Sequence, residues 1–194
     1  MNLSVEKALK IRTDLQGGLK NLKVETFAMR RIFGSVPLIF QNANDCFDWK
    51  IRLAQKINVD PCSIFLIGSA CTGISLNPSK NYKSFDSKSD IDVAVVSGYH
   101  FEVGWRALRE IGSSLYKMTP AEKSAIDEHR LEYLYWGMIA TDKILSYLPF
   151  GRDWILALTD LAKEPPVLNR EIKIRLYRDS YSLTSYHHNN LRNL

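Results

Sequence analysis

Two short stretches decide how this chain is interpreted. They are Phe65-Leu66-Ile67-Gly68-Ser69 and, further along, Ser89-Asp90-Ile91-Asp92-Val93-Ala94-Val95-Val96. The alternation in the second stretch predicts a β-strand, and because side chains two residues apart on a strand share a face, Asp90 and Asp92 are expected to point the same way. A buried carboxylate pair needs a cation or hydrogen bonds to compensate it. Mg²⁺ (or Mn²⁺) suits that role, since Mg²⁺ often takes only one or two carboxylates and fills its other positions with water and phosphate oxygens.

The first stretch supplies what phosphate groups need. Residues 64–67 form an apolar run typical of a central strand, and Gly68-Ser69 ends it where a helix is expected to begin. Glycine allows a ligand to approach the backbone closely, and exposed amides beside the Ser69 hydroxyl form an anion site of the kind found at helix N-termini. Gly73 keeps the next turn thin. We therefore expect this turn to bind the phosphates of a nucleotide.

The order of strand, Gly-Ser, and a second strand bearing Asp-x-Asp preceded by Ser89 resembles the DNA polymerase β-like nucleotidyltransferase superfamily, above all its small stand-alone bacterial members. The resemblance covers residues 63–97. It implies that Gly68 and Ser69 hold the phosphates of an NTP and that Asp90 and Asp92 hold two metal ions. It also implies attack of an acceptor hydroxyl on the α-phosphorus, with loss of pyrophosphate.

The segment between the two halves of the motif is longer than in typical small family members. We interpret Ser75–Lys88 as a mobile flap at the mouth of the nucleotide site, in which lysines suit phosphate and the rings of Tyr82 and Phe85 suit a base.

The family also carries a third acid on a later strand. The candidate here is Glu171, which opens an expected strand over 171–177; Asp179 closes that strand, and neither acid matches the family pattern well. Lys173 and Arg175 share a face of the same strand. Beside the Asp-x-Asp strand they could neutralise a triphosphate, or they could form structural ion pairs with the two aspartates, in which case a basic residue replaces the metal and the domain is inactive.

Composition favours a single domain. The chain has 194 residues, 45% of them apolar, which suffices for one substantial core. We expect a helical N-terminal extension over 1–58 and a nucleotidyltransferase core over 59–194. No run approaches the length of a membrane helix and the start is too polar for a signal peptide, so a cytoplasmic protein with no membrane partner is expected. The net charge of +5 suits a polyanionic substrate without identifying one.

The expected architecture is α+β, a small mixed sheet with packed helices. The pattern predicts helices near 3–12 and 20–34, a helix to Ile57 capped by Asn44 or Asp45, an amphipathic helix over 103–115, a helix from Pro120 towards Pro149 capped by Thr119, a helix over 154–162 and a closing helix over 183–194.

Several aromatic and imidazole groups invite functional interpretations. His187 and His188 could supply a general base or a metal ligand, but adjacent histidines on a helix point in different directions, and a solvated helix end is the simpler account. His129 is expected on a polar or packing face, while Trp105, Trp136 and Trp154 are expected to anchor helix packing.

Two functions remain open on the sequence. The first is a metal-dependent nucleotidyltransferase that moves a nucleoside monophosphate from an NTP to a protein, RNA, nucleotide or small-molecule acceptor. The second is an inactive domain of the same fold that binds nucleotide or RNA, as a partner in a bacterial defence or toxin–antitoxin module. An acid beside Asp90 and Asp92 favours the enzyme, and a lysine or arginine in that place favours the binding domain.

Overall fold

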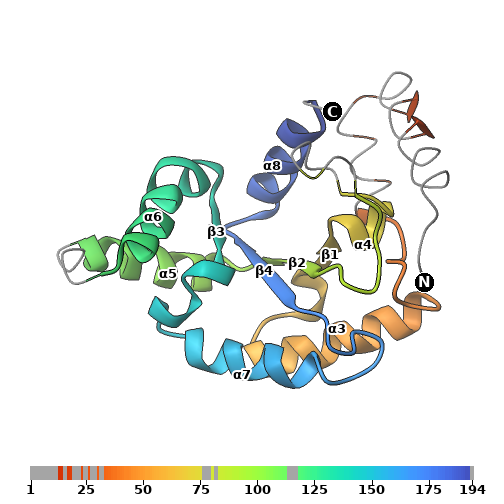
Figure 1. The fold of residues 1–194 in the computed structure, drawn as a ribbon, viewed down its shortest axis with the longest axis horizontal. Helices are drawn as coiled ribbons and strands as arrows, with labels where there is room; N and C mark the ends of the chain where they lie inside the picture. The colour runs from red at the N-terminus through yellow and green to blue at the C-terminus, as the bar shows by residue number, and fades with distance from the viewer. Residues whose placement is uncertain are drawn as a thin grey trace.

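The computed structural model describes residues 33–75, 80, 83–112 and 118–192, together with the isolated positions 13, 14, 17, 18, 23, 26 and 30. The helices expected near 3–12 and 20–34 fall largely outside the described residues. Within the described residues the fold is α+β, as expected, and is built on a four-stranded mixed sheet (Figure 1).

The strand order in the sheet is β1-β2-β4-β3. Strands β1 (Ile64–Ile67) and β2 (Ile91–Val96) pair antiparallel, β2 pairs parallel with β4 (Ile172–Tyr177), and β3 (Met138–Ala140) pairs antiparallel with β4. The two halves of the motif therefore lie on neighbouring strands, and the strand that carries Lys173 lies directly beside the strand that carries Asp92.

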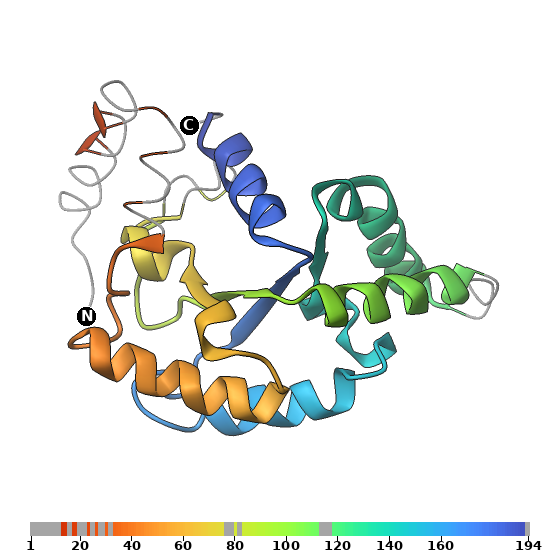
Figure 2. The same ribbon diagram turned by 180° about the vertical axis from the view of Figure 1, so that it is seen from behind.

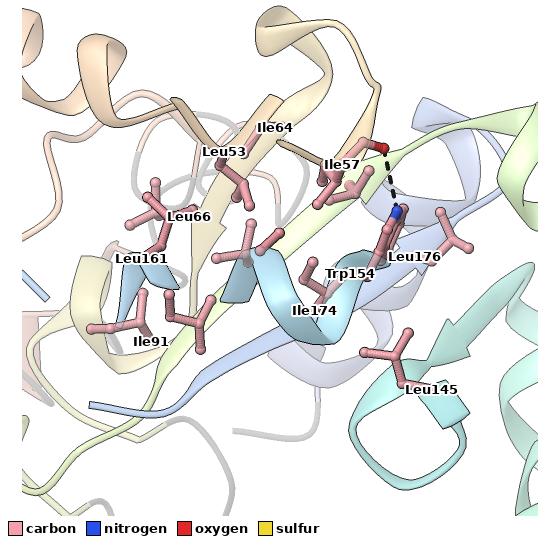
Figure 3. Packing of buried hydrophobic residues seen from close by; sticks show 14 of the residues in the cluster. Leu53, Ile57, Ile64, Leu66, Ile91, Leu145, Trp154, Leu161, Ile174 and Leu176 are labelled. Carbon is pink, nitrogen blue, oxygen red and sulfur yellow. Dashed lines mark hydrogen bonds between the residues drawn. The ribbon is translucent and has the colours of Figure 1, made fainter. Parts of the chain in front are cut away.

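The larger core lies on one face of the sheet. Helices α3 (Ala43–Ile57), α5 (Gly98–Ile111) and α7 (Gly151–Leu161) cover that face with buried side chains. Figure 2 shows α3 and α7 side by side beneath the strands. In the close view of this core (Figure 3), the Trp154 Nε1–H donates to the carbonyl of Ile57 at 3.2 Å, so Trp154 is confirmed as a packing anchor.

The opposite face of the sheet carries a smaller core and the candidate site. Helix α8 (Ser180–Arg192) lies over this face, and its Leu183 and Leu191 pack with Ile67, Ala94 and Tyr177. Residues directly opposite one another on paired strands have their side chains on the same face of the sheet, so Asp92 of β2 and Lys173 of β4 share a face.

The helix expected from Pro120 towards Pro149 is much shorter than predicted. The capping box at Thr119 is confirmed, but α6 ends at Glu128 and continues as a π-helical turn over His129–Tyr133 and a 3₁₀ turn over Leu134–Trp136. Gly137 then takes a left-handed conformation, with φ of 63°, which ends the helical path.

Strand β3 follows Gly137, so Met138, which falls within the helix expected from Pro120 towards Pro149, is buried in a strand instead. Buried His129 ties the two elements together. Its Nδ1 lies 2.6 Å from the carbonyl of Ala125 and its Nε2 lies 2.9 Å from the carbonyl of Ala140. Of the two placements expected for His129, a polar face or a packing face, the structure shows the packing one.

Other helix starts differ from the prediction by a few residues. Asn42, rather than Asn44 or Asp45, caps α3, because its side chain accepts from the backbone N–H of Asp45. Helix α5 begins at Gly98, with Ser97 as its N-cap. The structure also contains short 3₁₀ helices over Pro61–Ser63, Thr141–Lys143 and Leu145–Tyr147. Among the described residues, no helix has both the length and the apolar character that crossing a bilayer requires.

Candidate functional site

A cavity of about 610 Å³ opens beside the α8 face of the sheet. The wall of this cavity contains six of the residues that the sequence assigned to the site, namely Gly68, Ser69, Ser89, Asp90, Asp92 and Arg175. It also contains Lys80, Lys83 and Lys88. The motif halves that lie apart in the sequence therefore form one site.

Gly68 shapes the turn between β1 and the short helix α4 (Ser69–Thr72). Its φ of 67° and ψ of −152° belong to a backbone region essentially restricted to glycine. A Cβ atom at this position would lie 2.7 Å from Asp92 Oδ2. The glycine therefore allows the carboxylate of Asp92 to sit against the backbone of the turn.

Asp92 lies opposite Ile67 of β1 and Lys173 of β4. Burial raises the pKa of its carboxyl group; the nearby Arg175 charge opposes the shift, and the Asp90 charge adds to it. Burial therefore disfavours the ionised form of Asp92, and a cation beside the carboxylate would stabilise that form.

Asp90 immediately precedes β2 and forms an ion pair with Lys173. The Lys173 Nζ lies 2.6 Å from Asp90 Oδ2 and 3.4 Å from Glu171 Oε2. Burial lowers the pKa of Lys173, but its hydrogen bond and charge attraction to Asp90, together with Glu171, outweigh burial and raise it. The ammonium group is therefore held between two carboxylates.

The third acid proposed from the resemblance, Glu171, does not line this cavity. Its carbonyl accepts the backbone N–H of Ile91 at 2.8 Å, so its backbone lies beside the start of β2, but its carboxylate faces Lys173 and its side chain is 62% exposed. The residue directly opposite Asp92 on β4 is Lys173. A basic side chain, and not the carboxylate of Glu171, thus lies beside Asp92 on β4.

Arg175 contributes positive charge to the cavity, although one of its Nη atoms is hydrogen-bonded to Asp142. It lies opposite Ala94, two residues after Lys173 on β4 and on the same face of the sheet. Arg175 is therefore held in place by Asp142 while it opposes the raised pKa of Asp92.

The segment interpreted as a flap is partly described, since 76–79 and 81–82, including Tyr82, lie outside the described residues. The Ser75 N–H donates to the Lys83 carbonyl at 2.8 Å, and the Phe85 N–H donates to the Gly73 carbonyl at 2.9 Å. Gly73 caps α4 with φ of 81° and lies outside the cavity lining.

Phe85 is buried in the core and does not line the cavity. The guanidinium of Arg170 lies 4.9 Å from the centre of its ring and donates to the Ser89 carbonyl at 2.9 Å. The expectation that Phe85 faces a nucleobase is therefore wrong, because its ring anchors the segment to the body of the protein.

Helix α8 supplies a wall of the cavity that the sequence interpretation missed. Tyr186, His187, Asn190 and Leu191 line it, together with Tyr177 of β4. His187, which was interpreted as part of a solvated helix end, is buried. The spacing offered a signal for this placement, because His187 stands four residues from both Leu183 and Leu191 and so lies on the apolar face of the helix.

The donor set has limits as a metal centre. No group of three or more His, Cys, Asp or Glu side chains placed to hold a metal occurs within the described part of the chain. Asp90 and Asp92 remain a two-carboxylate set on one face, which fits an ion such as Mg²⁺ that keeps water and phosphate oxygens as its other ligands. Lys173 competes with such an ion for Asp90.

No protein-family model, curated protein or solved structure matches this chain.

Proposed function

We propose that this chain is a metal-dependent nucleotidyltransferase with a sheet of the nucleotidyltransferase type. It transfers a nucleoside monophosphate from an NTP to an acceptor hydroxyl or phosphate on a protein, RNA, nucleotide or small molecule, and pyrophosphate leaves. The observation that carries the proposal is the single cavity in which the Gly68-Ser69 turn meets Asp90 and Asp92.

The charges around the cavity suit a triphosphate. Lys80, Lys83, Lys88 and Arg175 line it, and these cations attract a polyanion and raise its local concentration. Within the turn, Gly68 allows close approach of a phosphate to the backbone, and the Ser69 hydroxyl can donate one hydrogen bond to it. These residues bind and orient the phosphates.

Asp90 and Asp92 would hold the divalent ion, which supplies neutralisation of charge on the triphosphate when bound. In the described conformation the Lys173 ammonium forms an ion pair with the Asp90 carboxylate. Catalysis therefore requires Lys173 to leave Asp90, and a phosphate oxygen of the bound nucleotide offers the displaced ammonium a new partner.

A second function is favoured by that same ion pair. If Lys173 keeps Asp90, its ammonium stands in for a metal ion, and the domain binds nucleotide or RNA without catalysis, as a partner of another protein in a defence or toxin–antitoxin module. The position opposite Asp92 on β4 is basic, which is the arrangement expected for such a binding domain.

One experiment separates the two functions. The purified chain is incubated with each α-³²P-labelled NTP and Mg²⁺ or Mn²⁺, with and without RNA, and label in protein, RNA and small molecules is measured together with pyrophosphate release. Binding is measured in parallel by calorimetry. The matched variants are Asp92→Asn in the cavity and Asp127→Asn, an exposed change on α6.

An enzyme releases pyrophosphate, loses this activity with Asp92→Asn and keeps it with Asp127→Asn. Nucleotide or RNA binding with no transfer from any NTP identifies the binding domain. Absence of both binding and transfer with all four NTPs overturns the proposed enzyme.

A further inference from the structure

The wall of the cavity formed by β4 and α8 carries two polar atoms without a hydrogen-bond partner among the described residues, Tyr177 Oη and His187 Nε2. The two residues are 0% and 9% exposed. A buried polar group that lacks a partner destabilises the fold, and such groups are rare in native proteins. Two of them on one cavity wall indicate a ligand that supplies the missing partners.

The fold brings these two groups together from distant parts of the chain. Tyr177 ends β4 on the face that also carries Lys173 and Arg175. Helix α8 crosses this face and places the ring of His187 with its centre 6.3 Å from that of Tyr177. Tyr186 adds a third ring, 5.7 Å from His187. The two residues with unpaired atoms therefore lie side by side on one wall of the cavity.

The two unpaired groups carry no charge, although Arg175, also on β4, adds a cation to the cavity lining. Burial raises the pKa of Tyr177 well above its usual value, and burial, reinforced by the neighbouring His188 charge, lowers the pKa of His187 to about 4. Both groups are therefore uncharged at pH 7, as is the amide of Asn190, which also lines the cavity. Neutral donors and acceptors beside aromatic rings recognise an uncharged polar ring, whereas a phosphate needs cations.

The cations of the cavity come from a different part of the chain, chiefly Lys80, Lys83 and Lys88. The cavity thus combines a cationic segment with uncharged aromatic groups on β4 and α8. A nucleotide has the same division, with charged phosphates at one end and an uncharged flat base at the other.

We propose that Tyr177 and His187 form the base-recognition site of this cavity, so that a bound nucleotide directs its base towards α8 and its phosphates towards the lysines of residues 80–88. The inference rests on the proposed function, because it takes a nucleotide as the ligand. The Tyr177 hydroxyl can donate to a ring nitrogen or carbonyl of the base, and His187 Nε2 donates or accepts according to its tautomer.

The test compares ligands with and without a base. Binding of Mg²⁺ complexes of the four NTPs and of inorganic tripolyphosphate is measured by calorimetry for the parent, Tyr177→Phe and Tyr181→Phe. Tyr177→Phe removes only the unpaired hydroxyl, and its melting temperature should be no lower than that of the parent. Tyr181 lies on α8, the helix that carries His187, is 78% exposed and serves as the control.

We expect the parent to bind at least one NTP more tightly than tripolyphosphate. Tyr177→Phe should weaken that NTP about three- to tenfold, as for one lost hydrogen bond, leave tripolyphosphate binding unchanged and reduce the preference among the four bases. Tyr181→Phe should change none of these affinities.

Unchanged NTP binding in Tyr177→Phe overturns the base site and assigns the hydroxyl to a water molecule. Equal losses for the NTP and tripolyphosphate also overturn it, because the wall then acts on phosphate. A parent that binds tripolyphosphate as tightly as every NTP overturns the base site alone, whereas a parent that binds neither overturns the proposed function as well.

Discussion

The ion pair between Asp90 and Lys173 provides the sharpest test of the site. The Lys173 Nζ lies 2.6 Å from Asp90 Oδ2, and the two side chains are only 32% and 23% exposed, with Asp90 the more exposed. Asp90→Asn and Lys173→Met each remove one charge, and together with the parent and the double variant they form a thermodynamic cycle that isolates the pairwise interaction.

The magnitude follows from the distance and the partial burial. At 2.6 Å, Coulomb's law gives roughly 6 kcal/mol for an effective dielectric constant of about 20 and about 1.6 kcal/mol in water. Desolvation of both groups offsets part of the attraction, so we expect a coupling free energy of about 2 kcal/mol, near that of a hydrogen bond between charged groups. In the Asp90→Asn variant the Lys173 ammonium keeps Glu171 as a charged partner, 3.4 Å away.

The assay is urea unfolding of the four proteins at pH 7, without ligand and with saturating Mg-NTP. The control cycle uses the more exposed pair Lys56 and Asp160, 3.4 Å apart, for which we expect a coupling below about 1 kcal/mol. In the enzyme, Mg-NTP draws Asp90 away from Lys173, and the Asp90–Lys173 coupling should fall towards zero; in a binding domain it should persist.

A ligand-free coupling between Asp90 and Lys173 no larger than that of the control pair would refute the reasoning, because the pair would then behave as a solvated surface contact. Each single variant must unfold in one cooperative transition for the cycle to be read in this way.

Three further outcomes are expected. Gly68→Ala should lower the free energy of unfolding by about 2–4 kcal/mol in urea titrations, because the new side chain would combine a strained backbone with a close contact to Asp92. Gly98→Ala is the control, since a Cβ atom there makes only an ordinary contact, and it should cost less than about 1 kcal/mol. Equal losses in the two variants would contradict this prediction. Ser69→Ala should keep the melting temperature but weaken Mg-NTP binding roughly tenfold in calorimetry, and parent-like binding would remove Ser69 from the site. Asp92→Asn should be at least as stable as the ligand-free parent at pH 7, because burial, reinforced by Asp90, raises the pKa of Asp92 and so penalises its charge. In urea titrations the stability advantage of the variant should shrink as the pH falls through that raised pKa towards the unfolded value of about 3.9. A large loss of stability at pH 7 would contradict the metal role.

The strands on either side of the motif could be predicted because their signals are local. The apolar run at 64–67 and the alternation over 91–96 appear in the structure as β1 and β2, and the capping box at Thr119 marks the start of α6. The long helix expected after it failed for a local reason as well. Apolar residues spaced for a helix also suit a short buried strand, and the left-handed Gly137 separates the helical turns from strand β3.

The candidate site was predicted only where it is built from adjacent strands. Gly68, Ser69, Asp90 and Asp92 meet because β1 and β2 pair directly. The contribution of α8 depends on which face of the sheet the helix covers, and this is decided by packing across the whole chain. His187 was consequently assigned to solvent although its spacing from two leucines placed it on the buried face.

The absence of a third acid from the described cavity follows from how β4 packs. Ile172, Ile174 and Leu176 are buried in the larger core, so Lys173, Arg175 and Tyr177 must face the cavity side of the sheet. A shift of one residue in the pairing would bury the charged side chains and expose the isoleucines. A shift of two would keep the faces and bring Glu171 opposite Asp92, but the observed register places Lys173 there. The proposed catalysis would therefore use two carboxylates and would require the Lys173 ammonium to leave Asp90, which is why the coupling between Asp90 and Lys173 distinguishes the enzyme from the binding domain.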